Sequence, residues 1–407
     1  MSGCVFLAGC TGLDSVEPAE RNTWMYFYGG LGNYTGVTAE PLDDGGFLLV
    51  GDSVSSSNYG ITVIRTDRHG KELWRNNIPR GSASGLKVTQ DGYFIIGSGI
   101  YVNLTEPVAA LQVRHVMRLL KINPNGGIDR DVLSGDTSVA NYNGNAVTVN
   151  GNFLYTVSDE KRFVPTNSNL IANVSTYDLS TLNLIKSNPY DLDDRDYVNT
   201  NSIYYTADGN LAWAMSAEFS NANSVRSAIR LPVLASNTFV NGDNYGNTDQ
   251  NFQVADFQPG GASFGIIGTY ATITNTKSNV FFVRTISNAN LTFQTSDIKF
   301  FDGGDPTDPD DSRVEDSGLA ISGTQDGGFL LGCSTTKTQT GKDILLIRVD
   351  FTGKTLWKKT IGGTGDEILS SIRATSDGGY IMSGTLDLAG LKSMFLLKVN
   401  ADGDLKD

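Results

Sequence analysis

The chain has 407 residues, 46 of them glycine, and a formal net charge of −13 at pH 7. This length suits one large all-β or repeat architecture better than a typical single domain. The acidic charge argues against binding to nucleic acid or anionic lipid headgroups, since both need clustered Lys and Arg. No apolar stretch of about 18 residues offers a candidate transmembrane helix.

The N-terminal segment carries a candidate lipidation site. Leu7-Ala8-Gly9-Cys10 resembles a bacterial lipobox, in which signal peptidase cuts before the cysteine and the cysteine thiol carries a diacylglycerol. The six residues upstream supply neither a basic region nor the full apolar region of a signal peptide, which indicates a truncated signal or a start assigned too late. We therefore expect residues 1–10 to be a signal remnant and Cys10 to be lipidated. The alternative is that residues 5–8 are merely an apolar chain end.

Residues 11–22 show no hydrophobic periodicity and contain Asp14, Glu17, Pro18 and Glu20, so they predict a flexible tether. Acidic residues shortly after a lipidated cysteine resemble the surface-export signals of Bacteroidetes lipoproteins. This resemblance implies an outer-membrane protein that is held by lipid at the cell surface. The opposite, periplasmic leaflet stays open.

A repeated hairpin dominates the rest of the chain, 23–407, which we expect to form one domain. Each copy has one or two glycines and an apolar strand, and in six of the seven copies an acidic or Asn residue precedes the glycines. Asp and Gly suit a tight turn, because Gly adopts positive φ and the Asp carboxylate caps the turn backbone. Seven copies begin at or next to Asp44, Asp91, Asn150, Asp208, Pro259, Asp326 and Asp377. Their spacing is near or above the length of a propeller blade, about 40–50 residues.

The second half of the unit also repeats, as 61–74 and 344–357, so that each unit carries four strands. The last unit ends after its third strand, 395–399. The missing strand is at the other end of the chain, because 23–30 copies 356–363. We predict an all-β, seven-bladed β-propeller with four-stranded blades, closed by the N-terminal strand pairing with the C-terminal blade.

The spacing from Asp67 to Trp74 and from Asp350 to Trp357 resembles the tryptophan-docking repeats of quinoprotein-like propellers. The whole chain resembles propeller lipoproteins of Bacteroidetes. Quinone-binding and Ca²⁺-binding residues of the quinoprotein dehydrogenases were not located, so the resemblance implies the fold and no cofactor. The Thr375-Ser376-Asp377-Gly378-Gly379 turn also resembles the Asp-box turns of sialidases, which are structural elements.

Few residues suggest chemistry. His69 lies in a predicted turn and His115 opens a strand, and neither has an obvious Ser, Cys or acid partner. Cys333 lies in an apolar strand and reads as a buried, unpaired thiol. The acidic loop 302–316 and the cluster 191–196 are either solvated loops or Ca²⁺ ligands, because hard cations prefer carboxylate oxygens.

A basic residue stands near the end of the third strand in six units, at Arg65, Lys121, Arg230, Arg284, Arg348 and Lys398. One hypothesis is a ring of cations that binds an anion. The other is that each cation pairs with a turn carboxylate such as Asp44, Asp326 or Asp377, because partly buried Arg usually needs such a partner.

The topology places the tight turns on one side of the propeller and the unlike loops on the other: 99–112, 158–169, 187–200, 236–251 and 301–317. Variable loops on a rigid scaffold are where recognition is usually built. We therefore expect a non-enzymatic surface lipoprotein that serves an outer-membrane barrel complex, for nutrient uptake or secretion. The alternatives are glycan or ligand binding, with Tyr101, Tyr197 and Tyr245 as stacking surfaces, or a glycan-active hydrolase or lyase.

Overall fold

A computed structural model gives the structure of the protein. It describes residues 22–55, 58–102, 113–138, 140–162, 170–191, 197–206, 208–221, 224–235, 238–245, 250–272, 278–289, 291–301, 315–337 and 341–405.

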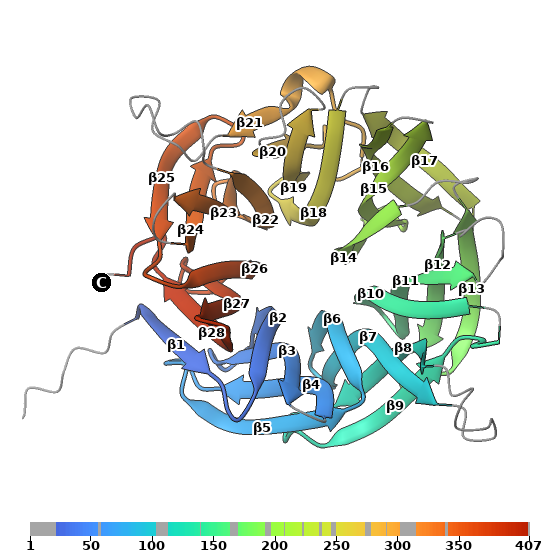
Figure 1. Cartoon of the computed structure of the whole chain (residues 1–407). Coiled ribbons are helices and arrows are strands. Elements are labelled where there is room, and N and C mark those ends of the chain that lie inside the picture. The colour runs from blue at the N-terminus through green and yellow to red at the C-terminus, as the bar shows by residue number, and fades with distance from the viewer. Residues whose placement is uncertain are drawn as a thin grey trace, which may run out of the picture.

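Seven four-stranded antiparallel blades surround a central axis (Figure 1), which confirms the predicted propeller. Blades 1 to 3 comprise β2 (Asn33–Pro41), β3 (Phe47–Ser55), β4 (Asn58–Thr66), β5 (Glu72–Pro79); β6 (Gly81–Thr89), β7 (Gly92–Val102), β8 (Val113–Ile122), β9 (Ile128–Ser134); and β10 (Ala140–Asn150), β11 (Phe153–Arg162), β12 (Leu170–Asp178), β13 (Leu184–Asp191). Blades 4 to 6 comprise β14 (Tyr197–Tyr205), β15 (Leu211–Asn221), β16 (Ser224–Ala235), β17 (Thr238–Tyr245); β18 (Gln250–Gly260), β19 (Ser263–Thr272), β20 (Asn279–Arg284), β21 (Lys299–Phe301); and β22 (Asp316–Gly323), β23 (Phe329–Lys337), β24 (Gly341–Val349), β25 (Thr355–Ile361).

Blade 7 is assembled from both ends of the chain. It contains β26 (Asp366–Ala374), β27 (Tyr380–Leu388) and β28 (Leu391–Val399), and its outermost strand is β1 (Trp24–Tyr28). β1 runs antiparallel to β28, with Trp24 opposite Lys398 and Tyr28 opposite Met394. The predicted closure is therefore correct, and it covers an edge that β28 would otherwise expose.

The hydrophobic core lies between blades rather than inside them. Each of seven clusters of buried apolar side chains joins two neighbouring blades, and the described residues complete the circle from blade 1 to blade 7. Leu48 and Val50 of blade 1, for example, share a cluster with Ile95 and Leu120 of blade 2. A single blade has no core of its own, so the blades depend on one another for stability.

Three tryptophans fasten neighbouring blades at their outer strands. Trp24 covers Gly70 and Trp74 covers Gly126, each in the turn between the third and fourth strands of the next blade. Trp357 covers Gly403, which follows the third chain segment of blade 7 at the equivalent position. The Trp74 indole also donates a hydrogen bond to the Pro124 carbonyl at 3.1 Å. These contacts occur at the blade 7–1, 1–2 and 6–7 boundaries.

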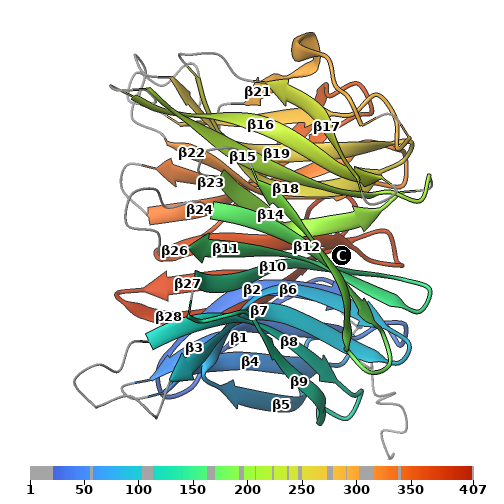
Figure 2. The ribbon, with the colours of Figure 1, turned by 90° about the vertical axis from the view of Figure 1, so that its right-hand side faces the viewer.

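The two sides of the ring differ in their connections. We call the side with the turns between strands one and two, and between strands three and four, the turn face. The side with the connections between strands two and three, and between blades, is the loop face. In the edge-on view of Figure 2 the loop face is to the left and the turn face to the right.

One predicted loop is wrong. Residues 236–251 were expected to be a long connection, but β17 lies inside them and forms the outermost strand of blade 4. Its sequence, TFVNGDNY, lacks the apolar alternation of the other strands, and it is held by pairing with β16. A single parallel pair, Ser227 with Asn251, links β16 to β18 and so joins blades 4 and 5.

Candidate functional site: the loop face and the polar ring

The unlike connections gather on the loop face, as predicted. They join β7 to β8, β11 to β12, β13 to β14 and β21 to β22. Their central parts, 103–112, 163–169, 192–196 and 302–314, lie outside the described residues. The described part of this face therefore consists of the strand ends beside these connections and the short hairpins of blades 1 and 7.

A pocket of about 330 Å³ opens on the loop face at blade 1. Tyr34, Val54, Tyr59 and Ile78 contribute to its wall, and Leu31, which is 97% exposed, stands at its edge. The Arg75 guanidinium lies 5.9 Å from the centre of the Tyr34 ring. These tyrosines were not singled out in the sequence. The structure does not describe the side chains of the tyrosines that the sequence suggested: Tyr101, Tyr197 and Tyr245.

A second pocket on this face, of about 260 Å³, lies between blades 2 and 3. His115 contributes to it together with Tyr142, Asp159 and Lys161. His69 is on the opposite, turn face, where its backbone N–H donates to the Asp67 carboxylate at 2.9 Å. The two histidines therefore belong to different sides of the molecule and do not form one site.

The innermost strands carry a ring of polar residues near the turn face. Six of the seven innermost strands contain a β-bulge at the same level. In β2, for example, the bulge follows Gly36, and Glu40 lies four residues later. The equivalent residue of each of these strands is polar. In β14, Tyr204 occupies the matching place, because it is opposite Ala212 as Glu40 is opposite Leu48. The polar ring consists of Glu40, Lys87, Thr148, Tyr204, Gln258, Ser322 and Arg373.

Arg373 joins the last blade to the first within this ring. Its Nε donates to Oε1 of Glu40 at 2.6 Å, and its Nη1 donates to the Ile372 carbonyl at 2.8 Å. Burial alone would lower the pKa of Arg373, but Glu40, Asp256 and Tyr204 outweigh it and raise the pKa above its ordinary value. Arg373 is therefore held as a cation next to two carboxylates.

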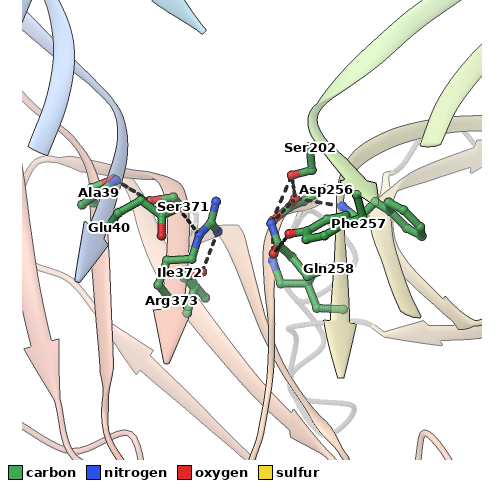
Figure 3. Close-up of polar contacts among 12 residues, drawn as sticks. Ala39, Glu40, Ser202, Asp256, Phe257, Gln258, Ser371, Ile372 and Arg373 are labelled. Carbon is green, nitrogen blue, oxygen red and sulfur yellow. Dashed lines mark hydrogen bonds and ion pairs between the residues drawn. The ribbon is translucent and has the colours of Figure 1, made fainter. Parts of the chain in front are cut away.

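Asp256 organises the facing side of the ring. Its Oδ1 accepts hydrogen bonds from the Ser202 hydroxyl, the Phe257 backbone N–H and the Gln258 amide at 2.8–3.0 Å, and its Oδ2 accepts one from the Ile321 backbone N–H at 3.1 Å. The Tyr204 hydroxyl donates to Oε1 of Gln258. Figure 3 shows this group facing the Glu40–Arg373 pair, with the guanidinium directed toward it.

The polar ring and Asp256 beside it thus tie blades 4, 5 and 6 together and link blade 7 to blade 1. A buried network whose members satisfy one another rigidifies the structure around it. The sequence contained no signal for it beyond a polar residue near the end of each innermost strand. Only the closed ring brings positions from opposite ends of the chain together.

In three blades the basic residue of the third strand forms an ion pair with a turn carboxylate. Arg65 pairs with Asp44, Arg348 pairs with Asp326, and Lys398 Nζ lies 2.9 Å from the Asp377 carboxylate. The second hypothesis is therefore confirmed for these three cations. Lys121 differs, because it lies over the Phe94 ring at 5.6 Å from the ring centre. These basic residues do not form a free ring for an anion.

Several candidate residues have no assigned chemistry. Cys333 is fully buried, and burial raises the pKa of its thiol well above the ordinary value, as expected for an unreactive cysteine. Cys10 and most of the acidic loop 302–316 lie outside the described residues, and Asp316 is buried at the start of β22. Within the described ranges, no group of three or more His, Cys, Asp or Glu side chains has the arrangement of a metal site.

No helix in the described part of the chain is long and apolar enough to cross a membrane.

Comparison with known proteins identifies the fold but no family. No family model matches the chain, and no curated protein matches it. The β-propeller domain of the Trilobed protease from Pyrococcus furiosus matches with a TM-score of 0.51 and 9% identity, over 93% of this chain and 97% of that one. That propeller is described as having an open velcro topology, whereas here β1 pairs with β28.

Two enzymes match as well. An acylaminoacyl peptidase matches with a TM-score of 0.50 and 10% identity, over 92% of this chain and 52% of the peptidase. The NanB sialidase of Streptococcus pneumoniae matches with a TM-score of 0.49 and 11% identity, over 96% of this chain and 72% of the sialidase. At such identities the similarity is one of fold, and the chain is a seven-bladed β-propeller.

Proposed function

We propose that this protein is a non-enzymatic surface lipoprotein of an outer membrane, anchored through Cys10, and that its loop face docks a β-barrel or other surface partner. One observation carries the proposal: four of the connections that differ most between blades, β7 to β8, β11 to β12, β13 to β14 and β21 to β22, lie on the loop face, whereas the turn face has one such connection, 285–298 between β20 and β21. Variable segments on a rigid scaffold are the usual basis of recognition.

The scaffold beneath the loop face is well suited to this role. Apolar clusters join all neighbouring blades, and β1 closes the ring. The polar ring adds hydrogen bonds near the axis. The strand ends on such a frame keep their relative positions, so binding of a partner does not have to bring the blades together.

The test is to purify the tagged protein from native membranes in mild detergent and to identify what remains bound by mass spectrometry. A stoichiometric barrel partner is expected. Replacing segments 103–112 and 163–169 by short Gly-Ser linkers should release that partner, while replacing the turn-face segment 235–238 should not. A folded protein that emerges alone, or a partner that survives both loop replacements, contradicts the proposal.

A second function, capture of a glycan or another ligand, is favoured by the blade 1 pocket, in which Tyr34 and Tyr59 offer aromatic surfaces. Titration calorimetry with isolated surface polysaccharides distinguishes it from partner docking. Binding that is lost in Tyr59→Ala and kept in Tyr205→Ala, an exposed turn-face tyrosine, supports this alternative. Turnover of the same polysaccharides would instead indicate a hydrolase or lyase.

A further inference from the structure

The rim of the turn face carries a series of exposed apolar side chains at related positions. They lie in the turn between the third and fourth strands or at the start of the fourth strand, in six of the seven blades. Each is 42–61% exposed. We call this set the apolar rim, and it consists of Leu73, Ile128, Leu184, Ile185, Ile286, Phe351, Leu356 and Leu405.

Three members of the apolar rim occupy the same structural position. Leu73, Ile185 and Leu356 are each the extra residue of a β-bulge at the start of the fourth strand. In blades 1 and 6 the next residue is a tryptophan that packs on the neighbouring blade. The bulge leaves the leucine before each tryptophan without a partner on the third strand, and its side chain is more than half exposed. The exposure thus follows from the repeat.

The chain enters the propeller on this same face. Trp24 of β1 is opposite Lys398, next to the turn face, and Asn22 contributes to a pocket there with Arg68 and Asp377. Cys10 precedes Asn22 by 12 residues, a length that reaches at most about 40 Å when fully extended. The disc itself is about 30 Å thick, because its strands have around nine residues.

We infer that the turn face lies on the bilayer, with the apolar rim in the zone between headgroups and acyl chains, and that the loop face points away from the membrane. This inference rests on the proposed lipid anchor at Cys10. With the loop face on the bilayer, the tether would have to be almost fully extended to pass the disc, whereas no such extension is needed with the turn face on the bilayer. The acidic chain has no cluster of cations for anionic lipid, so the contact is apolar and uses zwitterionic lipid.

The arrangement explains how one anchor serves the proposed docking function. A lipidated cysteine alone leaves the propeller free to tilt. Apolar side chains on the turn face of six blades favour the orientation in which that face meets the bilayer. The variable connections are then presented on the side away from the lipid, where a partner or ligand has access.

The test supplies the anchor chemically, so that it does not depend on native lipidation. The unlipidated chain beginning at Cys10 is coupled through that thiol to phosphatidylcholine vesicles bearing a maleimide lipid, since Cys333 is buried. Hydrogen exchange is compared for coupled and free protein. Amides of 67–73 and 350–356 should exchange roughly threefold more slowly on vesicles. Amides of 51–55 and 386–391, on the loop face, should not change.

Matched variants separate membrane contact from a general effect of coupling. Leu73→Asp with Leu356→Asp should abolish the protection, whereas Leu388→Asp with Leu391→Asp, which are also more than half exposed but on the loop face, should leave it intact. Protection of the loop face, or none on either face, overturns the inference. Mass spectrometry of the native protein tests the anchor separately: a chain without lipid at Cys10 contradicts the proposed function.

Discussion

At the scale of single residues, polar side chains on the second strands hold neighbouring blades together. In three blades such a side chain accepts a hydrogen bond from a backbone N–H of the next blade's innermost strand, just before its bulge. The pairs are Asp52 with Ala83, Ser216 with Val254, and Thr385 with Gly36, at 2.7–3.0 Å. Because a buried N–H needs an acceptor, these contacts help to fix how adjacent blades sit.

Asp52 is the one member of this set that ionises. Burial raises the pKa of Asp52 to about 6, although the hydrogen bond from Ala83 opposes the shift. A folded-state pKa above the ordinary value means that the folded protein binds the proton more tightly. The stability that this contributes is present below about pH 4 and is lost as the pH rises through 6.

Asp52→Asn should therefore stabilise the protein at pH 8, because the amide keeps an oxygen for the Ala83 N–H without burying a charge. We expect a gain of about 1–2 kcal/mol at pH 8 and little difference at pH 4. Urea unfolding at both pH values measures it. An Asn variant that is no more stable than the parent at pH 8 would show that the carboxylate is not destabilising.

The turn carboxylates behave in the opposite way. The pKa of Asp326 is lowered, first by the Thr324 hydroxyl and also by Arg348 and the Gly328 N–H, while burial opposes the change. Its stabilising contribution is therefore present above the ordinary pKa and is lost in acid. Arg348 is 8% exposed and depends on this partner.

Asp326→Asn should cost about 1–2 kcal/mol at pH 7, because it leaves a buried guanidinium without its counter-charge. The cost should shrink as the pH falls below the ordinary aspartate pKa, because Asp326 of the parent then becomes protonated. Asp91→Asn changes the same turn of blade 2, where the third-strand cation Lys121 lies over the Phe94 ring, and should have an effect within about 0.5 kcal/mol. Equal losses in both variants, by chemical denaturation, would refute the role of the Arg348 pair.

At the scale of elements, a side chain of the preceding blade packs on the turn between strands three and four. An Asp or Asn at its first position accepts backbone N–H bonds from two residues further on, as Asp67, Asn123, Asp350 and Asn400 all do. The glycine three positions after each adopts positive φ. In blades 1, 2 and 7 a tryptophan of the preceding blade lies on that glycine, and in blade 6 Lys299 takes its place.

Gly70→Ala should be more damaging than Gly353→Ala, although both glycines have φ near +80° in the same turn. A Cβ at Gly70 would lie 2.6 Å from the Trp24 ring, whereas at Gly353 the nearest atom is 3.3 Å away on the flexible Lys299 side chain. Backbone strain is common to both, at about 1 kcal/mol, and overpacking adds about 1–3 kcal/mol at Gly70. Thermal unfolding of the two variants measures the difference, and equal losses would contradict tryptophan docking.

At the scale of the whole molecule, closure depends on two contacts between the ends of the chain. β1 completes blade 7 at the outer rim, and Glu40 pairs with Arg373 near the axis. Both join residues more than 300 positions apart, counting from Trp24 to Lys398 and from Glu40 to Arg373. The closing contacts are therefore expected to form late in folding, since long loops are costly to close.

A double-mutant cycle on Glu40 and Arg373 tests the inner contact. Arg373→Met or Glu40→Gln alone should cost about 3 kcal/mol, because each leaves a largely buried charge unpaired. The double variant should cost less than the sum, with a coupling of about 1–3 kcal/mol. Additive losses in chemical denaturation would mean that the two charges do not stabilise the closed ring through each other.

Much of the architecture follows from local sequence. The Asp-Gly turns, the apolar strands and the copy of 356–363 at 23–30 predict seven blades and their closure, because turn chemistry and strand alternation act over a few residues. The pairing of Arg65, Arg348 and Lys398 with turn aspartates was one of two hypotheses, and it depends only on neighbouring strands of a hairpin. The strand β17 was missed, since its polar sequence is a strand only through its pairing with β16.

The sequence by itself thus determined the repeat, the number of blades and the strand that closes them, since these rest on short-range patterns. Only the tertiary structure decided what the ring brings together. The polar ring with Glu40 and Arg373, the Asp256 group beside it and the apolar rim each combine residues from separate blades. Their proximity depends on the curvature and closure of the whole ring, which no local pattern encodes.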